Sequence, residues 1–261
     1  MSYETIKVEL RGSFAHIKLN RPKQRNAVNE TLANEFRAAL ESVSADEAIR
    51  AVVISGEGNA FCAGADVSQF GNELTPAEVE TYLLEKYKPI ISAITSMPKP
   101  VIAAVHGPAA GAGMSIALAC DFRVMSDEAA IYPAFIKIGL VPDAGATWFL
   151  ARQIGYSRAL EFLIDGRAMP AERCLALGMA NRVVRPDQLA AEAEKWAREL
   201  AERPTYAIAL TKQALAFACD NDLMASFDTE ARYQKLAIAT EDHQAGIEAF
   251  KNRTTPVYKG R

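Results

Sequence analysis

The sequence predicts an α/β fold in which parallel strands are covered by helices. Short apolar runs alternate along the first half of the chain with segments whose apolar residues recur at helical spacing. This alternation is typical of parallel sheets with helices on their faces. Beyond Pro142 the pattern becomes almost wholly helical. Half of the 261 residues are hydrophobic, which is enough for one large domain, with or without an appendage.

The first elements of the chain are predicted to be a hairpin, a helix and a buried strand. Strand-like residues 6–10 and 14–19 flank the turn-forming sequence Arg-Gly-Ser. Residues 29–43 carry apolar side chains three or four positions apart, which indicates an amphipathic helix. A short apolar run then predicts a strand over residues 51–55.

Later elements follow from capping and breaking residues. Thr75 and Glu78 form a capping box with Pro76 at the first helical position, which predicts a helix to about residue 96. The remaining predicted elements are strands at residues 101–105, 122–125 and 182–184, a helix over about residues 112–119, and three helices within residues 198–251 that break at Pro204, Asn221-Asp222 and Thr240.

These patterns divide the chain into a core, residues 1–197, and a C-terminal helical region, residues 198–261. Large apolar side chains in the second region could form a subunit interface or pack within one subunit, and the sequence favours neither. They are Phe217, Phe227, Tyr233, Leu236 and Phe250.

Composition excludes several classes of function. The net charge of −3, with both signs interleaved, gives no indication of nucleic-acid binding. The four cysteines lie far apart without a Cys-x-x-Cys pair, so we expect reduced thiols in the cytoplasm, with no disulfide framework and no zinc site. The polar N-terminus and the Pro- and Gly-broken apolar stretch 100–120 predict neither a signal peptide nor a membrane span.

Two turns rich in Gly and Ala follow buried strands and are the most informative feature of the chain. The first ends in Phe61-Cys-Ala-Gly-Ala-Asp66, and the second contains Ala110-Gly-Ala-Gly113. Side chains this small leave backbone N–H groups uncovered, so the amides can face a ligand. Two such turns side by side would give one oxygen two N–H donors, the arrangement that stabilises an oxyanion.

Asp143 is the candidate general base. Pro142 and Asp143 resemble the start of a helix, where an aspartate is often only a cap, so the sequence alone leaves both roles open. Its apolar neighbours include Leu140, Val141 and Trp148. A carboxylate that is partly desolvated among such residues has a raised pKa and accepts protons better near neutral pH.

Four motifs in order give the chain a resemblance that spans nearly its whole length. They are Leu19-Asn-Arg-Pro-Lys-Gln-Arg-Asn26, Phe61-Cys-Ala-Gly-Ala-Asp66, Lys99-Pro-Val-Ile-Ala-Ala-Val-His-Gly107 and Ala110-Gly-Ala-Gly113. With them the chain resembles the enoyl-CoA hydratase/isomerase (crotonase) superfamily. The resemblance implies a crotonase-like spiral of ββα units, a C-terminal helical trimerisation region, and a homotrimer or a homohexamer built as a dimer of trimers. It also implies an acyl-CoA substrate whose thioester oxygen binds the backbone N–H groups of Ala65 and Ala112.

Departures from the family pattern are as telling as the matches. Hydratases of this family use two glutamates, and the matching positions here are Ser115 and Phe135. Water addition needs one group to deprotonate water and one to protonate the α-carbon, so ordinary hydration is not expected. Asp143 instead matches the single acid of isomerases that shift a double bond or rearrange ring-epoxide phenylacetyl-CoA, the members that the chain resembles most.

The resemblance therefore implies an acyl-CoA isomerase that converts 3-enoyl-CoA to 2-enoyl-CoA, or ring-1,2-epoxyphenylacetyl-CoA to the oxepin in phenylacetate degradation. Asp143 would move the proton, with no metal and no redox cofactor, and coenzyme A would enter only as part of the substrate. The residues that it implies for substrate binding are Lys23, Arg25, Ala63, Gly64, Asp66, Val67, Phe135 and Trp148.

Other readings of the sequence are weaker. Gly111-Ala-Gly113 lacks the third glycine and the well-spaced acid of a dinucleotide site. The residues around Ser115 do not form the nucleophile elbow of a serine hydrolase. A hydratase-like lyase and a catalytically silent acyl-CoA-binding oligomer remain alternatives, although the presence of Asp143 argues against the silent form.

Overall fold

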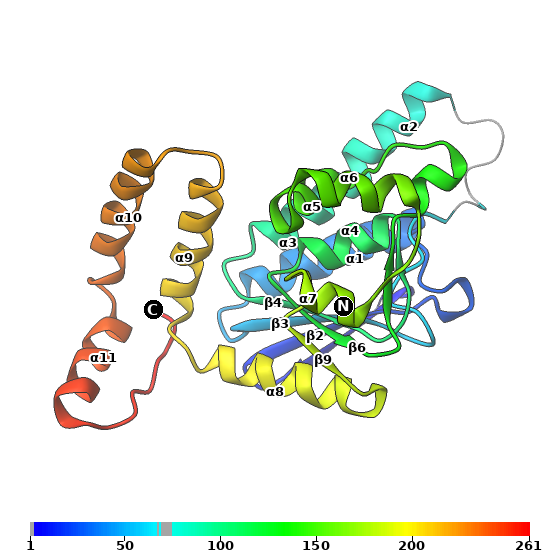
Figure 1. Cartoon of the computed structure of the whole chain (residues 1–261). Helices are drawn as coiled ribbons and strands as arrows, with labels where there is room; N and C mark the ends of the chain where they lie inside the picture. The colour runs from blue at the N-terminus through cyan, green and yellow to red at the C-terminus, as the bar shows by residue number, and fades with distance from the viewer. Residues whose placement is uncertain (1–2, 67, 69–74) are drawn as a thin grey trace.

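The computed structural model describes residues 3–66, 68 and 75–261, and its centre is a six-stranded sheet (Figure 1). The strand order is β1-β2-β3-β4-β6-β9, in which β1 and β2 are antiparallel and every later pair is parallel. The strands are β1 Ile6–Arg11, β2 Phe14–Leu19, β3 Ala51–Gly56, β4 Val101–Val105, β6 Phe122–Ser126 and β9 Arg182–Val184. The predicted hairpin and parallel sheet are therefore confirmed.

Both faces of the sheet are buried, because successive side chains of each strand point to opposite sides. Val52 and Ile54 pack with the larger core under α1, α3 and α4, whereas Val53 packs with Leu189 of α8 on the other face. Figure 1 shows α8 beneath the sheet and helices α1 to α6 above it. The core helices are α1 Glu30–Ala45, α2 Pro76–Tyr82, α3 Lys88–Thr95, α4 Ala112–Ala119, α5 Ala146–Ile154, α6 Tyr156–Asp165, α7 Ala171–Ala176 and α8 Leu189–Ala201.

The prediction of one continuous helix from Thr75 to about residue 96 is wrong, because the helix is interrupted. Thr75 does cap α2 through a capping box with Glu78, but a π-helical turn, Leu83–Tyr87, separates α2 from α3. The cause is Pro89, which has no N–H for the Glu85 carbonyl and whose ring crowds that carbonyl. A π turn removes the conflict by shifting the hydrogen bonds one residue along.

A three-stranded sheet that the sequence did not reveal holds the second Gly/Ala turn in place. Its order is β5-β7-β8, with β5 Ala109–Ala110, β7 Ala130–Tyr132 and β8 Met169–Pro170. Two or three residues are too few to show any periodicity, so such strands leave no pattern in the sequence.

The C-terminal helices stand apart from the sheet, with α9 and α10 side by side (Figure 1). They are α9 Thr205–Ala218, α10 Leu223–Ala237 and α11 Glu241–Asn252, which confirms the breaks at Pro204, Asp222 and Thr240. The proposed boundary between residues 197 and 198 falls inside α8, whose Ala197 and Ala201 still pack on the sheet. No helix in the described part of the chain is long and apolar enough to cross a bilayer.

Candidate active site

The two Gly/Ala turns lie against each other and are joined by backbone hydrogen bonds. The Phe61 amide donates to the Pro108 carbonyl at 3.1 Å, and the Ala110 amide donates to the Cys62 carbonyl at 2.9 Å. Gly113 permits this approach, since a Cβ atom there would lie 2.3 Å from the Cys62 carbonyl oxygen. The structure therefore meets the condition under which the two turns could offer N–H donors to one oxygen.

The amides of Ala65 and Ala112 are both available to an oxygen ligand. Neither N–H donates to another group in the described residues, and Ala112 is the first residue of α4, where helical N–H groups have no partner within the helix. Gly64 lies between them. A Cβ atom on Gly64 would be 3.3 Å from the Ala112 nitrogen, so only glycine leaves the space beside that amide open.

Asp143 lies in the loop between a 3-10 helix, Ala134–Ile138, and α5. The expectation that a helix begins at Pro142-Asp143 is wrong, because Ala144 and Gly145 adopt left-handed backbone angles, φ 49° and 83°. The helix starts only at Ala146, whose amide donates to the Asp143 carbonyl at 3.0 Å. Asp143 is thus a loop residue, and its side chain is not a helix cap.

The Asp143 carboxylate is partly buried and lacks the partners that usually satisfy such a group. Its Oδ1 atom is shielded from solvent and accepts no hydrogen bond from the described residues. Burial raises its pKa from 3.8 to about 6. A carboxylate with this pKa is mostly ionised at neutral pH and accepts a proton more readily than an exposed aspartate.

Ser115 and Phe135 lie close to this loop, and neither is an acid. Ser115 is fully buried in α4, and its hydroxyl donates to the Asp143 backbone carbonyl at 3.0 Å. It therefore fixes the loop that carries the base, a role that its sequence position did not reveal. The Phe135 ring is 3.8 Å from where a Cβ atom of Gly111 would be, so it packs against the second turn.

The loop with the predicted coenzyme A contacts runs beside the first turn. Lys23 and Arg25 are exposed there, and the Arg25 carbonyl accepts the Ala63 amide at 2.9 Å. On the same stretch the Gly64 carbonyl accepts the Val28 amide at 2.7 Å. The structure thus brings Lys23, Arg25, Ala63 and Gly64 to one edge of the candidate site.

Asp66, at the end of the first turn, has its carboxylate engaged by neighbouring side chains. The Asp66 carboxylate binds the Ser68 hydroxyl at 2.5 Å and the Arg21 guanidinium at 2.8 Å, contacts that keep its pKa below the usual value. Its charge therefore stabilises the turn. Val67 lies outside the described residues.

Sequence reasoning missed Asn26, a fully buried residue whose amide donates to carbonyls of the loop before Phe61, including that of Ala60 at 2.8 Å.

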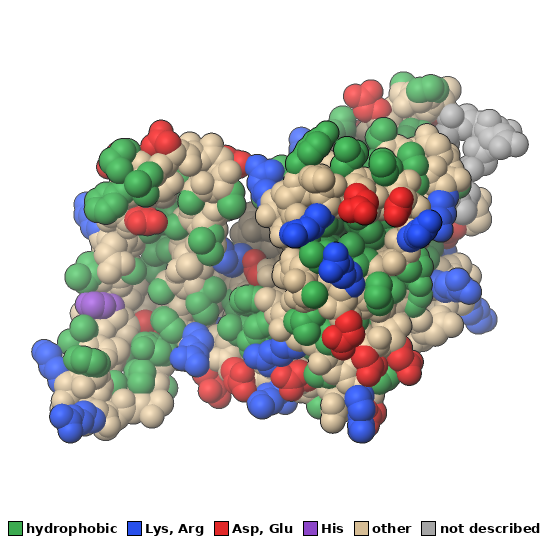
Figure 2. Space-filling view, in the orientation of Figure 1, with side chains coloured by type: hydrophobic (Ala, Val, Ile, Leu, Met, Phe, Trp, Pro, Cys, Tyr) green, Lys and Arg blue, Asp and Glu red, His purple; other side chains and the backbone are tan. Residues whose placement is uncertain are grey.

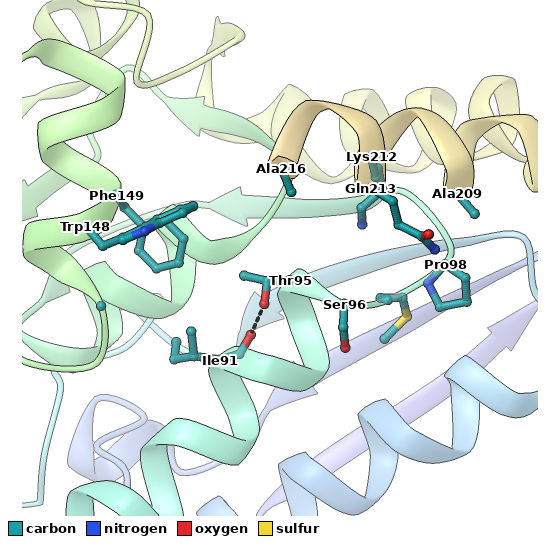
Figure 3. Close-up of a pocket in the computed structure, with 12 residues that line it drawn as sticks. Ile91, Thr95, Ser96, Pro98, Trp148, Phe149, Ala209, Lys212, Gln213 and Ala216 are labelled. Carbon is teal, nitrogen blue, oxygen red and sulfur yellow. Dashed lines mark hydrogen bonds between the residues drawn. The ribbon is translucent and has the colours of Figure 1, made fainter. Parts of the chain in front are cut away.

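Trp148 lies in a pocket of about 490 Å³ between the core and α9 (Figure 3). The pocket begins beside the base loop, because Gly145 and Phe149 line it. Trp148 is 44% exposed, meets the Phe149 ring edge-on with centroids 5.1 Å apart, and is stacked by Arg152. Figure 3 shows the facing wall of α9, from which Lys212 and Gln213 project. Trp148 and Phe149 thus give this pocket an apolar wall.

Comparisons with known proteins define the class of this molecule. The family model for enoyl-CoA hydratase/isomerase matches residues 9–261. The chain is 38% identical, over the full length of both chains, to a probable enoyl-CoA hydratase of Rhodobacter capsulatus. It is 37% identical to the 1,2-epoxyphenylacetyl-CoA isomerase of Escherichia coli, over 94% of each chain. A solved enoyl-CoA hydratase from Bacillus anthracis superposes with a TM-score of 0.94 at 31% identity, covering 99% of this chain and 100% of that one.

The chain therefore belongs to the enoyl-CoA hydratase/isomerase family and has the crotonase fold, as the sequence motifs predicted. It is an enzyme of this family that acts on acyl-CoA thioesters.

Proposed function

We propose that the protein is an acyl-CoA isomerase that uses Asp143 as its only acid–base residue. The observation that carries this proposal is the desolvated, unpaired carboxylate of Asp143 beside the paired turns, with Ser115 and Phe135 where hydratases carry glutamates. A proton shift between two carbons of one substrate needs one group that first accepts and then returns the proton.

The reaction begins when Asp143 removes a proton from the α-carbon of the bound thioester. Negative charge then develops on the thioester oxygen, where the Ala65 and Ala112 amides stabilise it. Protonated Asp143 returns the proton to the γ-carbon, which converts a 3-enoyl-CoA into the conjugated 2-enoyl-CoA. In the oxepin formed from a ring-epoxide phenylacetyl-CoA, the same shift moves the α-proton to a ring carbon.

Coenzyme A is expected to bind along the first turn. Lys23 and Arg25 would meet its phosphates, and Ala63, Gly64 and Asp66 would line its channel. Phe135 and Trp148 give apolar walls for the acyl group, which supports an aliphatic chain and an aromatic ring equally.

The four cysteines are unpaired, which supports a location in the cytoplasm.

Three substrates test the proposal: 3-hexenoyl-CoA, ring-1,2-epoxyphenylacetyl-CoA and crotonyl-CoA. We expect isomerisation of at least one of the first two and only slow hydration of crotonyl-CoA. Fast hydration of crotonyl-CoA would show that water addition proceeds without glutamates at positions 115 and 135. Tight acyl-CoA binding without any turnover would instead indicate a silent acyl-CoA-binding protein.

The pH dependence of kcat/KM should report the raised pKa of Asp143. The base must be ionised to accept the α-proton, so activity is expected to be lost as pH falls through about 6, where this carboxylate protonates. Below that point kcat/KM should decrease about tenfold per pH unit. Initial rates between about pH 4.5 and 8 measure the midpoint, and a midpoint near 4, the ordinary range of an exposed aspartate, would contradict a desolvated base.

We expect the C-terminal helices to form the contact surface of a homotrimer or a dimer of trimers. Figure 2 shows hydrophobic side chains over α10 and α11, and Phe250 is 84% exposed. Exposed apolar patches of this kind mark contact surfaces. We expect Phe250→Glu to shift the protein from three or six copies of the 28.3 kDa chain toward one, measured by light scattering. Lys251→Glu, the next residue of α11, is the control and should leave the assembly unchanged.

A further inference from the structure

Tyr87 brings a buried hydroxyl group to the candidate site, and nothing described in the chain accepts its hydrogen. The residue is 2% exposed, and its Oη atom has no hydrogen-bond partner among the described residues. Its ring meets the Tyr82 ring edge-on with centroids 5.7 Å apart. A buried donor without a partner costs about 1–3 kcal/mol, so its presence calls for an explanation.

The backbone at Tyr87 is unusual as well. Tyr87 is the last residue of the π-helical turn that Pro89 causes between α2 and α3. Such turns interrupt a helix at some cost and are frequent at functional sites. The unpaired hydroxyl and the irregular helix are independent observations at one residue.

The Tyr87 phenol has electrostatic neighbours in both parts of the candidate site, the first turn and the base. Burial raises its pKa most, and the neighbouring Tyr82, Cys62, Asp143 and Asp66 raise it further, so the hydroxyl keeps its proton at neutral pH. Cys62 belongs to the first turn, and Asp143 is the proposed base. The hydroxyl therefore keeps its proton as a donor within electrostatic range of the turn and the base.

None of these neighbours satisfies the phenol. The Cys62 thiol donates to the Asn26 carbonyl at 3.1 Å, and the Asp66 carboxylate is held by Ser68 and Arg21. Asp143 Oδ1 is itself buried without a hydrogen bond, although it lies near enough to influence the phenol. The described residues therefore leave the Tyr87 hydroxyl free to donate to a bound molecule.

We propose that Tyr87 is a specificity-determining residue that donates a hydrogen bond to an oxygen atom on the acyl group. The inference rests on the proposed function and narrows its substrate class. The thioester oxygen is already assigned to the Ala65 and Ala112 amides, and a plain hydrocarbon chain offers no other acceptor. The site then prefers acyl-CoA thioesters that carry an epoxide, ether or hydroxyl oxygen close to the reacting carbons.

Binding of two unreactive thioesters tests this inference without relying on turnover. Phenylacetyl-CoA and 2-hydroxyphenylacetyl-CoA differ by one ring oxygen, and calorimetry gives the ratio of their dissociation constants. We expect the wild type to bind the hydroxylated thioester at least about tenfold more tightly, as one hydrogen bond to a buried group implies. In Tyr87→Phe that ratio should fall to nearly one, whereas Tyr82→Phe, a change in the neighbouring ring, should keep it.

An equal ratio in wild type and Tyr87→Phe would overturn the inference. The variant should fold, because it removes only a hydroxyl that has no partner among the described residues, and its thermal midpoint checks this. The outcome is separable from the proposed function. A Tyr87-dependent ratio in a protein that isomerises nothing would support the inference and refute the isomerase. Isomerisation by a protein whose ratio of dissociation constants does not depend on Tyr87 would support the isomerase and refute the inference.

Discussion

Replacing Asp143 with asparagine is expected to lower kcat for isomerisation by about 10⁴-fold, the upper end of what one acid–base group contributes. The effect should be this large because the same carboxylate both accepts and returns the proton, and neither Ser115 nor Phe135 can replace it. Asparagine has nearly the same shape, so acyl-CoA affinity should change little. Single-turnover rates and the dissociation constant of a saturated acyl-CoA separate the two effects.

Stability measurements on the same variant show whether the loss is chemical. The folded-state pKa of Asp143 is raised from 3.8 to about 6, so the folded protein holds this proton more tightly than the unfolded chain does. The raised pKa therefore costs the wild type stability as pH rises from about 4 to about 6, and the cost is complete above that range. The asparagine side chain of the variant does not ionise, so the variant carries no such cost.

At pH 7 the variant should consequently be more stable, by about 1–2 kcal/mol after allowance for partial exposure, and at pH 4 the two proteins should be equal. Urea unfolding at both pH values measures the difference. An inactive variant that is also less stable at pH 7 would mean that Asp143 supports the fold, and the assignment of the base would fail.

The sequence was sufficient to predict those parts of the fold that repeat a pattern. Buried strands such as β3 and β4 are continuous apolar runs, and α1 begins at Glu30 because the Asn29 side chain caps it. The two Gly/Ala turns were recognisable because small residues follow each strand. The family motifs also pointed to Ala65 and Ala112, which lie in the two turns that the structure brings together.

Features that depend on distant contacts could not be predicted. The left-handed backbone at Ala144 leaves no mark in the sequence, since alanine rarely adopts it, and it moves the start of α5 past Asp143. The bond from Ser115 to the Asp143 carbonyl joins residues 28 positions apart. Tyr87 was missed because a single tyrosine in a helical stretch looks like ordinary core.

Gly64→Ala should have the second largest effect, because it acts on the paired amides and not on the base. Gly64 has φ 92°, and a Cβ atom there would lie 2.7 Å from the Ala110 carbonyl oxygen and 3.3 Å from the Ala112 nitrogen. The backbone cannot easily retreat, since the Gly64 carbonyl accepts the Val28 amide. The added methyl group would therefore crowd the Ala112 N–H and displace the thioester oxygen.

Loss of one oxyanion donor costs about 3–4 kcal/mol, so kcat should fall about 10²–10³-fold while the pH midpoint of about 6 stays in place. Gly12→Ala is the matched control, because Gly12 also has a positive φ, 65°, but has no atom near its missing Cβ. Both variants should lose about 1–2 kcal/mol of stability from the left-handed backbone. Gly64→Ala should lose further stability from the contact with the Ala110 carbonyl oxygen, and only Gly64→Ala should lose activity. A Gly64→Ala enzyme with wild-type kcat would show that the oxygen does not bind between Ala65 and Ala112, because a methyl group in that space would then be without effect.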